Sequence, residues 1–306
     1  MAVERVAVTG GAGRLGTHIT DAVPDGRAVT AIDIAPPPRP DVDFVDADVS
    51  DREALTKAFA GHDAVMHLAA IPNLFAAPPD VIMQVNVQGT WNVLQAAESA
   101  GVRRVVLCSS DSATGYTLLK EHMTLPRYLP LDEAHVLRPS DAYGLSKLLG
   151  EEVGRSFARR GRLEVVALRP PFILFEDFHA EIAARVIDPE NYDGPVAGAP
   201  RAAGGGPWFH YVEPEDVARA FWLALELADV SFDVFFVSAA TTYAPAPTLQ
   251  IVERFFGELP DVTKPEVYRD NPFAPLFDLG RARDILCFEA QGTTGRRLAD
   301  EALGSG

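Results

Sequence analysis

Short apolar runs alternate along most of the chain with longer stretches in which apolar positions recur about every three or four residues. The runs that predict strands cover residues 6–8, 28–33, 43–45, 64–70 and 104–110. Helical spacing covers a stretch that begins near Arg14, residues 51–60 with Ser50 or Asp51 as the cap, and residues 80–100. Continuous apolar runs are typical of strands buried on both faces. The pattern predicts an α/β fold, a doubly wound parallel sheet with helices on both faces.

The second half of the chain has a less regular pattern. Further helices are expected from a start within residues 139–147, over residues 176–187, over residues 214–227 with a cap near Glu213, over residues 249–256, and shortly after Gly280 and Thr294. Short strands are expected at residues 209–212 and 232–237, and the second of these closes the sheet. Residues 189–206 are rich in Pro, Gly and Ala and predict a flexible loop or lid. We expect a sheet domain of residues 1–170 plus about 207–240, and a small C-terminal substrate-binding lobe of about 171–206 plus 241–306.

A glycine-rich turn follows the first predicted strand. Gly10, Gly13 and Gly16 have the spacing Gly-x-x-Gly-x-x-Gly, and the helical pattern that starts near Arg14 carries Leu15 on its apolar face. Glycine lets the backbone turn tightly and approach a phosphate, and a helix start offers N–H groups and the positive end of the helix dipole. A strand, a glycine turn and a helix start in this order predict a site for the diphosphate of a nucleotide.

An acidic residue ends the second predicted strand. Asp33 stands where a dinucleotide site has a carboxylate that accepts hydrogen bonds from the adenosine ribose, so it favours NAD over NADP. Arg14 and Arg39 oppose this assignment, because an arginine near that ribose can receive a 2′-phosphate. After the third strand, Asp48 is a candidate to bond the adenine amino group. The sequence therefore predicts NAD, with NADP as the weaker alternative.

Tyr143 and Lys147 are four residues apart in a predicted helix and so share one of its faces. A lysine ammonium beside a phenol stabilises the phenolate, which makes the tyrosine an acid or base near neutral pH. The fifth predicted strand ends in Ser109 and Ser110, and a serine hydroxyl there can hold a substrate oxygen in line. Such a trio suits proton transfer at a carbinol or carbonyl oxygen. His67 is interpreted as a packing residue of the fourth strand, which ends in small residues against which a flat cofactor can lie.

Composition narrows the classes of partner. The chain has 306 residues, of which 47% are hydrophobic, so it can bury a large core. Its net charge is −16 and it has no basic run, which argues against nucleic acid and anionic membrane surfaces as partners. Two cysteines do not make a disulfide framework and indicate a reducing compartment. Because no run reaches transmembrane length and the N-terminus enters a strand directly, we expect a cytoplasmic protein, and we expect no metal site.

The order of these parts resembles that of the extended short-chain dehydrogenase/reductase family, also called the NAD-dependent epimerase/dehydratase family. The motifs that carry the resemblance are the glycine turn, Asp33, Asp48, residues 67–70, 86–90 and 109–110, the Tyr143/Lys147 pair, and residues 168–170, 209–212, 216–218 and 278–283. The resemblance covers nearly the whole chain and implies a Rossmann fold with a catalytic triad of Ser110, Tyr143 and Lys147. It also implies that Ser110, rather than Ser109 or Ser112, is the family's serine, and that Lys147 bonds the nicotinamide ribose.

By the same resemblance, Asn86 supports Lys147 through a water molecule, although a polar residue bonded within its own helix is an equally good interpretation. The residues expected to contact NAD are Gly10, Gly13, Arg14, Leu15, Gly16, Asp33, Asp48, Val49, Leu68, Ala69, Ala70, Tyr143, Lys147 and Pro170. Relatives commonly form homodimers through the helices that correspond to residues 80–100 and 141–159, and we expect the same here. Trp91, Leu148 and Phe157 add apolar residues to these helices beyond one core-facing stripe.

Departures from the family pattern bear on the substrate. Members that act on nucleotide sugars usually have an asparagine where this chain has Phe172, and a phosphate-holding arginine where it has Pro207, followed by Trp208. The candidates to replace these polar residues are Arg201, Arg269 and Arg281. The dehydratase subclass needs an acid pair after its catalytic residue, and here Asp111 is followed by Ser112. This stretch looks more like that of uronate dehydrogenases, which act on free sugar acids, although their Asn and His are not kept.

The hypothesis favoured by the sequence is an NAD-dependent oxidoreductase that acts on a hydroxyl or carbonyl of a small sugar, sugar acid or polyol. The residues expected to line its substrate pocket are Asn73, Ser110, Asp111, Ser112, Phe172, Trp208 and His210. The alternative is an epimerase or dehydratase of sugars, including nucleotide sugars, with tightly bound NAD. The third hypothesis, a non-catalytic NAD-binding protein, is disfavoured by the intact Ser110/Tyr143/Lys147 set.

Overall fold

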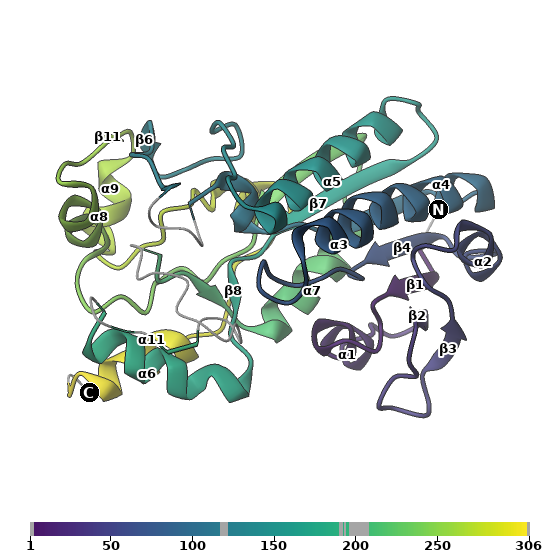
Figure 1. Ribbon diagram of the computed structural model, residues 1–306, viewed down its shortest axis with the longest axis horizontal. Coiled ribbons are helices and arrows are strands. Elements are labelled where there is room, and N and C mark those ends of the chain that lie inside the picture. Colours follow the sequence, from purple (N-terminus) through teal and green to yellow (C-terminus); the bar gives the residue numbers. More distant parts are fainter. Residues whose placement is uncertain (1–2, 117–121, 190–191, 193, 196–207, 305–306) are drawn as a thin grey trace. The chain divides into compact units, whose positions relative to one another are not determined.

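The protein is described by a computed structural model that covers residues 3–116, 122–189, 192, 194–195 and 208–304 (Figure 1). The chain forms two compact units. The sheet unit consists of Met1–Ser110, Ala142–Arg169 and Ala218–Val234, and the second unit of Asp111–Asp141, Pro170–Val217 and Phe235–Gly306. The chain thus crosses between the units more often than the expected domain boundaries imply. Within the described ranges, every helix is too short or too polar to span a lipid bilayer.

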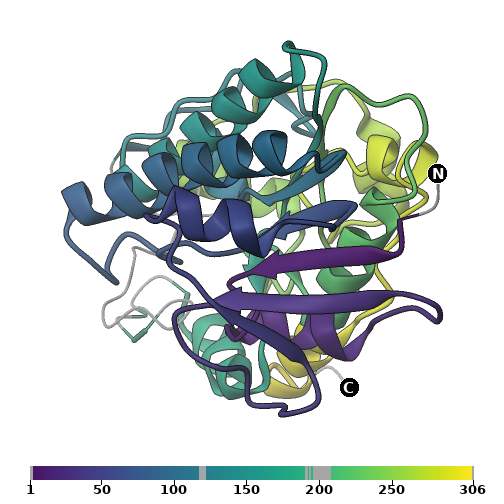
Figure 2. The same ribbon diagram turned by 90° about the vertical axis from the view of Figure 1, so that its right-hand side faces the viewer.

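A seven-stranded sheet forms the centre of the sheet unit, in the strand order β10-β7-β5-β4-β1-β2-β3. Its strands are β1 (Arg5–Thr9), β2 (Ala28–Asp33), β3 (Asp43–Asp46), β4 (Ala64–His67), β5 (Arg104–Cys108), β7 (Glu164–Arg169) and β10 (Phe232–Phe236). Neighbours from β3 to β7 pair in parallel, and Figure 2 shows the N-terminal strands side by side. Most side chains on both faces of β1, β4 and β5 are buried, because these strands consist of continuous apolar runs. The doubly wound parallel sheet is confirmed.

Helices cover both faces of this sheet. On one face lie α2 (Arg52–Ala58), α4 (Gly89–Ala100) and α5 (Ala142–Ala158), and α4 packs against the other two. On the other face lie α1 (Arg14–Asp21) and α7 (Pro214–Ala224), which are joined by a bond from Trp222 Nε1 to the Ile19 carbonyl oxygen (3.3 Å). Asp51 caps α2 as expected, because its carboxylate accepts the N–H groups of Glu53 and Ala54.

The core of the sheet unit lies between the sheet and the layer of α2, α4 and α5. Residues from all these elements contribute to it, among them Leu55, Val93, Val105, Phe157 and Val165. Phe157, which was expected outside the core-facing stripe, is instead completely buried, and its ring meets that of Trp91 (centroids 5.1 Å apart). That expectation is wrong for Phe157 because α5 is covered by α4 on one side and by the sheet on another.

Several predicted elements end elsewhere than expected. The helix predicted over residues 80–100 consists of α3 (Pro79–Met83), a π-helical turn η1 (Gln84–Gln88) and α4. The strands predicted to reach residues 70 and 110 end at His67 and Cys108. Helix α7 ends at Ala224 rather than at residue 227, because the Arg104 guanidinium binds the carbonyl oxygens of the last residues. These carbonyls belong to Ala224, Leu225 and Leu227 (3.2, 2.7 and 2.6 Å).

The second unit is built from short elements. Its strands pair as β6 (Tyr128–Leu129) with β11 (Asp261–Val262), and β8 (Phe172–Ile173) with β9 (Tyr211–Val212). Its helices include α6 (His179–Ile187), α8 (Thr248–Phe256), α9 (Pro265–Asp270), α10 (Gly280–Asp284) and α11 (Thr294–Ala302), and α6 packs against α11. Helix α9 and strand β7 have no counterpart among the predicted elements. The loop predicted at residues 189–206 lies largely outside the described residues.

Candidate active site

The glycine turn lies where the order of the strands reverses. The chain moves outward from β1 to β3 and then returns to β4 beside β1, and doubly wound sheets bind ligands at the carboxyl ends of strands at such a point. Gly10 has φ +72°, and a Cβ there would lie 2.6 Å from the Ala69 nitrogen. A Cβ on Gly16 would lie 2.3 Å from the Gly10 carbonyl oxygen. Side chains are therefore excluded from the turn, which leaves a backbone cradle suited to a diphosphate.

The predicted ribose-binding carboxylate is tied to this turn. Asp33 ends β2, and its two oxygens accept the N–H groups of Ala12 (3.0 Å) and Ile34 (2.8 Å). A carboxylate oxygen that accepts one such bond keeps a lone pair for a ribose hydroxyl. Arg39, which was considered for a 2′-phosphate, instead pairs with carboxylates that include Asp21 (2.6 Å). The position of the Asp33 carboxylate at the turn and the pairing of Arg39 with Asp21 both favour a nucleotide without the 2′-phosphate.

The loops beside the turn carry the other residues expected at the cofactor. Leu68 and Ala69 donate their N–H groups to the Thr9 carbonyl oxygen (3.0 and 3.1 Å), so the loop after β4 is held against the end of β1. Asp48 accepts the Ser50 N–H (2.7 Å) in the turn before α2. Arg14 and Leu15 open α1, and Gly13 precedes them. The other residues expected at the cofactor are Val49, Ala70 and Pro170, of which Pro170 belongs to the second unit.

Helix α5 presents Tyr143 and Lys147 one turn apart. The Lys147 ammonium donates to the Cys108 carbonyl oxygen at the end of β5 (2.8 Å) and lies 5.6 Å from the centroid of the Tyr143 ring. Desolvation by the surrounding protein lowers the pKa of Lys147, and it raises the pKa of the Cys108 thiol. Ser110 and Tyr143 are both buried. All three residues of the predicted triad belong to the sheet unit.

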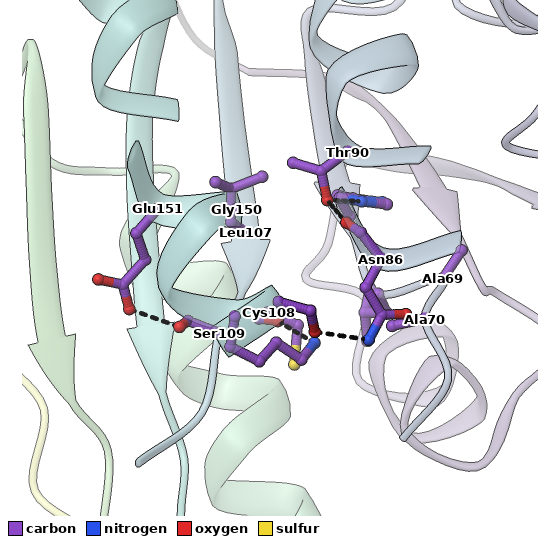
Figure 3. Close-up of a pocket in the computed structure, with 13 residues that line it drawn as sticks. Ala69, Ala70, Asn86, Thr90, Leu107, Cys108, Ser109, Gly150 and Glu151 are labelled. Atoms are coloured by element: carbon purple, nitrogen blue, oxygen red, sulfur yellow. Dashed lines mark hydrogen bonds between the residues drawn. The ribbon is translucent and has the colours of Figure 1, made fainter. Parts of the chain in front are cut away.

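A pocket lies beside Lys147 and is lined by the ends of β4 and β5 and by residues of η1, α4 and α5 (Figure 3). It brings together five predicted site residues, which are Leu68, Ala69, Ala70, Asn86 and Lys147. The other residues that line it are His67, Thr90, Leu107, Cys108, Ser109, Ser146, Gly150 and Glu151. Ser110 and Tyr143 are not among the residues that line this pocket.

Asn86 joins two other elements from the π-helical turn. Its Oδ1 accepts the Ile71 N–H (2.7 Å), and its Nδ2 donates to the Ile71 carbonyl oxygen (3.1 Å) and to Ser146 Oγ (2.9 Å). The side-chain amide is thus bonded to the loop after β4 and to α5, so the interpretation as a residue bonded within its own helix does not hold. Water-mediated support of Lys147 by Asn86 stays a prediction.

His67 is a fully bonded packing residue, as the sequence indicated. Thr90 Oγ1 donates to the Asn86 carbonyl oxygen (2.6 Å), so it must accept the bond from His67 Nε2 (3.0 Å). Nε2 therefore carries the proton, and Nδ1 accepts from Thr9 Oγ1 (2.7 Å). Burial lowers the pKa of His67 to about 3, which keeps the ring neutral. Over the described part of the chain, no three metal-ligating side chains are grouped to hold an ion.

A buried ion pair at this pocket was not predicted. Arg169, the last residue of β7, donates to both oxygens of Glu151 on α5 (2.8 and 2.7 Å), and the two side chains are only 1% and 2% exposed. The Ser109 hydroxyl also donates to Glu151, as the dashed line in Figure 3 shows. The sequence signal for Glu151 is its position four residues after Lys147, which places both on one face of α5.

The residues expected around the substrate divide between the units. Asn73, in the sheet unit, accepts the Phe75 N–H in a local turn (2.9 Å). Those in the second unit are Asp111, Ser112, Phe172, Trp208 and His210. Trp208 and His210 are buried with ring centroids 5.5 Å apart, and burial lowers the pKa of His210 to about 3. The Phe172 ring packs against that of Phe178 (centroids 5.4 Å apart).

The arginines considered for a substrate phosphate are partly engaged elsewhere. Arg269 pairs with the adjacent Asp270 at the surface (3.0 Å), and Arg281 lies 3.7 Å from a Glu133 carboxylate oxygen. Arg201 lies outside the described residues, as does Pro207. Arg269 and Arg281 therefore both have carboxylate partners within the second unit.

Known proteins share this architecture. The NAD dependent epimerase/dehydratase family matches residues 6–238 of the chain. The protein belongs to this family. It is 40% identical over 178 residues to L-arabinose 1-dehydrogenase (NAD(P)(+)) of Haloferax volcanii, a match that covers 56% of this chain and 68% of that protein. It is 28% identical over 170 residues to uronate dehydrogenase of Pseudomonas putida, covering 54% of this chain and 59% of that protein.

A solved structure resembles this member of the epimerase/dehydratase family over almost its whole length. It is a short-chain dehydrogenase/reductase superfamily protein from Agrobacterium tumefaciens with bound NAD, with 27% identity, a TM-score of 0.68, and coverage of 99% of this chain and 97% of that one. The predicted family, Rossmann fold and NAD cofactor are thereby confirmed, and the protein is an enzyme of an NAD-dependent family.

Proposed function

We propose that the protein is an NAD-dependent oxidoreductase that interconverts a hydroxyl and a carbonyl of a small sugar, sugar acid or polyol. The observation that carries this proposal is the placement of Lys147, whose ammonium is bonded to the Cys108 carbonyl oxygen and lies 5.6 Å from the Tyr143 ring centroid. An ammonium close to a phenol stabilises the negative charge of the phenolate. Tyr143 is thereby prepared to take or return a proton near neutral pH.

The residues around the glycine turn fit a dinucleotide. Gly10 and Gly16 admit no side chain, and no side chain caps α1 at Gly13, so a diphosphate can approach the backbone at the helix start. Asp33 offers acceptors to the adenosine ribose, and the loop that includes Ala69 offers a flat backbone surface. The chemistry supplied by bound NAD is hydride transfer, which no amino-acid side chain performs.

The side chains of the triad handle the proton. In the oxidative direction, the Tyr143 phenolate takes the proton of the substrate hydroxyl while the Ser110 hydroxyl donates a hydrogen bond to the same oxygen. In the reductive direction, Tyr143 returns that proton to the oxygen. We assign this role to Ser110, as the family resemblance implies, and the Ser109 hydroxyl donates to Glu151. Lys147 keeps its positive charge beside Tyr143 in both directions.

Two aromatic residues of the second unit and two of the relatives support a substrate without a nucleotide. Phe172 and Trp208 stand at or next to positions where nucleotide-sugar enzymes of the family carry polar residues, and aromatic rings offer a diphosphate no charged partner. Two of the relatives are named for L-arabinose and for uronate, whereas others, 32% identical, are named as UDP-glucose 4-epimerases. We therefore assign an aldose or a uronic acid as the substrate class.

The test measures NADH formation by the purified protein with L-arabinose, other aldoses and uronic acids, and compares NAD with NADP. Tyr143→Phe should abolish the rate while NAD binding, measured by calorimetry, persists. Wild-type protein that binds NAD but reduces it with none of these substrates would overturn the proposal.

The family itself favours a second candidate, a sugar epimerase or dehydratase that retains NAD through each turnover. The two candidates differ in what a denatured sample releases. Stoichiometric NAD that survives purification, with a rearranged sugar as product and no net NADH, would identify the second. A protein that binds added NAD reversibly and releases NADH would identify the dehydrogenase.

We also infer that two copies of the chain pair through α4 and α5. These helices pack side by side, and they expose Trp91 and Leu145 (37% and 38%). Large apolar side chains exposed on neighbouring helices suit a self-complementary interface. Cys108 and Cys287 are both free thiols, which agrees with a reducing compartment such as the cytoplasm.

A further inference from the structure

Helix α5 holds the end of β5 at two successive residues. One turn apart on this helix, Lys147 binds the Cys108 carbonyl oxygen and Glu151 binds the Ser109 hydroxyl. The next residue is Ser110, the serine assigned to the substrate. The two bonds tie two successive residues at the end of β5 to α5, in addition to the pairing of β5 with β4 and β7 in the sheet.

Arg169, the last residue of β7, forms an ion pair with Glu151. It donates to both Glu151 oxygens (2.8 and 2.7 Å), which is the bidentate geometry that suits a guanidinium and a carboxylate. With the bond from Ser109, the Glu151 carboxylate accepts from two elements of the sheet at once. Charges buried this deeply are tolerated only when they are paired, so each partner keeps the other in place.

The same pair determines what Lys147 binds. Lys147 and Glu151 share one face of α5, a spacing at which opposite charges often pair on a helix. Within the described ranges no ion pair joins them, since Glu151 is engaged by Arg169 and the Lys147 ammonium is bonded to an uncharged carbonyl. The positive charge of Lys147 therefore remains for the Tyr143 phenolate.

The ionisable groups that face Lys147 come from four elements. They are His67 on β4, Cys108 on β5, Tyr143 and Glu151 on α5, and Arg169 on β7 behind Glu151. His67 is neutral, and the raised pKa of the Cys108 thiol keeps it neutral as well. Desolvation lowers the pKa of Lys147, whereas the negative charge of Glu151 acts to raise it. Glu151 and its partner are thus the groups through which the charge on Lys147 can be adjusted.

Building on the proposed function, we infer that Glu151 and Arg169 are positioning residues for the reaction. Their ion pair holds the β5 end against α5, and Arg169 keeps the Glu151 carboxylate from binding the Lys147 ammonium. Neither residue is required to touch the substrate, so removing either should lower kcat more than it raises KM.

The test titrates Lys147 directly, with isotope-labelled lysine side chains observed by NMR in the full-length protein. The chain has only four lysines, which are Lys57, Lys120, Lys147 and Lys264, so Lys147→Arg identifies the signal of interest. Glu151→Gln keeps an oxygen for Ser109 but removes the charge, and the pKa of Lys147 should fall by about one unit. Arg169→Met leaves the carboxylate unpaired, and the pKa of Lys147 should rise by about one unit. In both variants kcat should fall roughly 10- to 100-fold.

The ion pair between Arg104 and Glu164 provides a matched control, because it joins the opposite ends of the same two strands (2.6 Å). Glu164→Gln should leave kcat and the pKa of Lys147 unchanged. The double variant Glu151→Leu/Arg169→Met removes both charges and should fold, with a Lys147 pKa between those of the two single variants. Shifts of the same sign in both single variants, or no shift in either, would overturn the inference. Opposite shifts in a protein that oxidises no sugar would support the arrangement around Lys147 and count against the proposed function.

Discussion

Asn86 and Ser146 are bonded side chain to side chain (2.9 Å), although they lie 60 positions apart in the chain. Asn86 also holds the loop after β4 at Ile71, and Ser146 donates to the Tyr143 carbonyl oxygen (2.7 Å). The loop expected along the cofactor is therefore linked by two side chains to the first turn of α5, which carries the proposed base. The link starts from a π-helical turn, a feature that is frequent at functional sites.

Removing this link should reduce both stability and rate. Asn86→Ala leaves the half-buried Ile71 N–H without its partner, so the free energy of unfolding should fall by roughly 1–3 kcal/mol. The kcat should fall as well, because the loop after β4 and the start of α5 are no longer held together. Urea unfolding and steady-state kinetics measure the two effects. Gln88→Ala, an exposed position in the same turn, is the control and should change neither.

The two neighbouring serines should give different losses. Ser110→Ala is expected to lower kcat roughly 100-fold, because the donor to the substrate oxygen is lost. Ser109→Ala removes the bond to Glu151 and should cost about 1 kcal/mol of stability with a smaller loss of kcat. Steady-state kinetics and chemical denaturation of both variants measure the losses of kcat and of stability. If Ser109→Ala lost more kcat than Ser110→Ala, the catalytic serine would be Ser109.

Asp33 should control the choice of nucleotide. Asp33→Asn keeps an oxygen for the Ala12 N–H but removes the charge that repels a 2′-phosphate. The Kd for NAD should rise about tenfold, which is 1.4 kcal/mol, and the preference for NAD over NADP should shrink. Calorimetric titration of both nucleotides tests this. Asp25→Asn, which alters a carboxylate at an exposed position, is the control. Unchanged affinities for both nucleotides in Asp33→Asn would contradict the assignment.

His67 should make the fold sensitive to acid. Its pKa in the folded protein is about 3, against an ordinary value of 6.5. Between these values the unfolded chain binds a proton that the folded chain does not, so the free energy of unfolding falls as the pH drops from 6.5 towards 3. The part due to His67 is on the order of 5 kcal/mol.

Urea unfolding over a pH series measures this loss. His67→Gln should be less stable at neutral pH, since the bonds to Thr9 and Thr90 are disturbed, but its stability should fall less steeply in acid. His122→Gln, at an exposed position, should keep the wild-type slope. A slope in His67→Gln equal to that of the wild type would mean that another group binds the proton.

A charge on α5 should separate the proposed dimer. Leu145→Glu places a carboxylate at an exposed apolar position (38% exposed), and its burial in an interface would cost several times the thermal energy. Sedimentation velocity should show a dimer for the wild type and a monomer for Leu145→Glu. Ile187→Glu, on the second unit and more exposed (66%), should remain a dimer. A wild type that sediments as a monomer at every concentration would refute the pairing.

The sequence by itself determined the sheet, the glycine turn and the shared helix face of the proposed reacting pair. Strands buried on both faces need continuous apolar runs, so the pattern of residues located β1 closely. The same pattern located β2 and β3 to within one residue, although both strands are only partly buried. Tyr143 and Lys147 share a face because of helical spacing, which is a local property. The cap of α2 at Asp51 is equally local, since it depends on N–H groups two and three residues further along the chain.

Only the tertiary structure decided which helices and strands pack against the faces of the predicted elements. Arg169 lies 18 positions beyond Glu151 and reaches it because β7 is the neighbour of β5 in the sheet, a pairing that no local pattern encodes. The end of α7 depends in the same way on Arg104, which belongs to a strand more than a hundred residues earlier. Helical and strand periodicity specify which side chains share a face, whereas the partner of that face follows from the order of strands and from the packing of helices over them. The contacts around Lys147 are therefore a property of the assembled sheet.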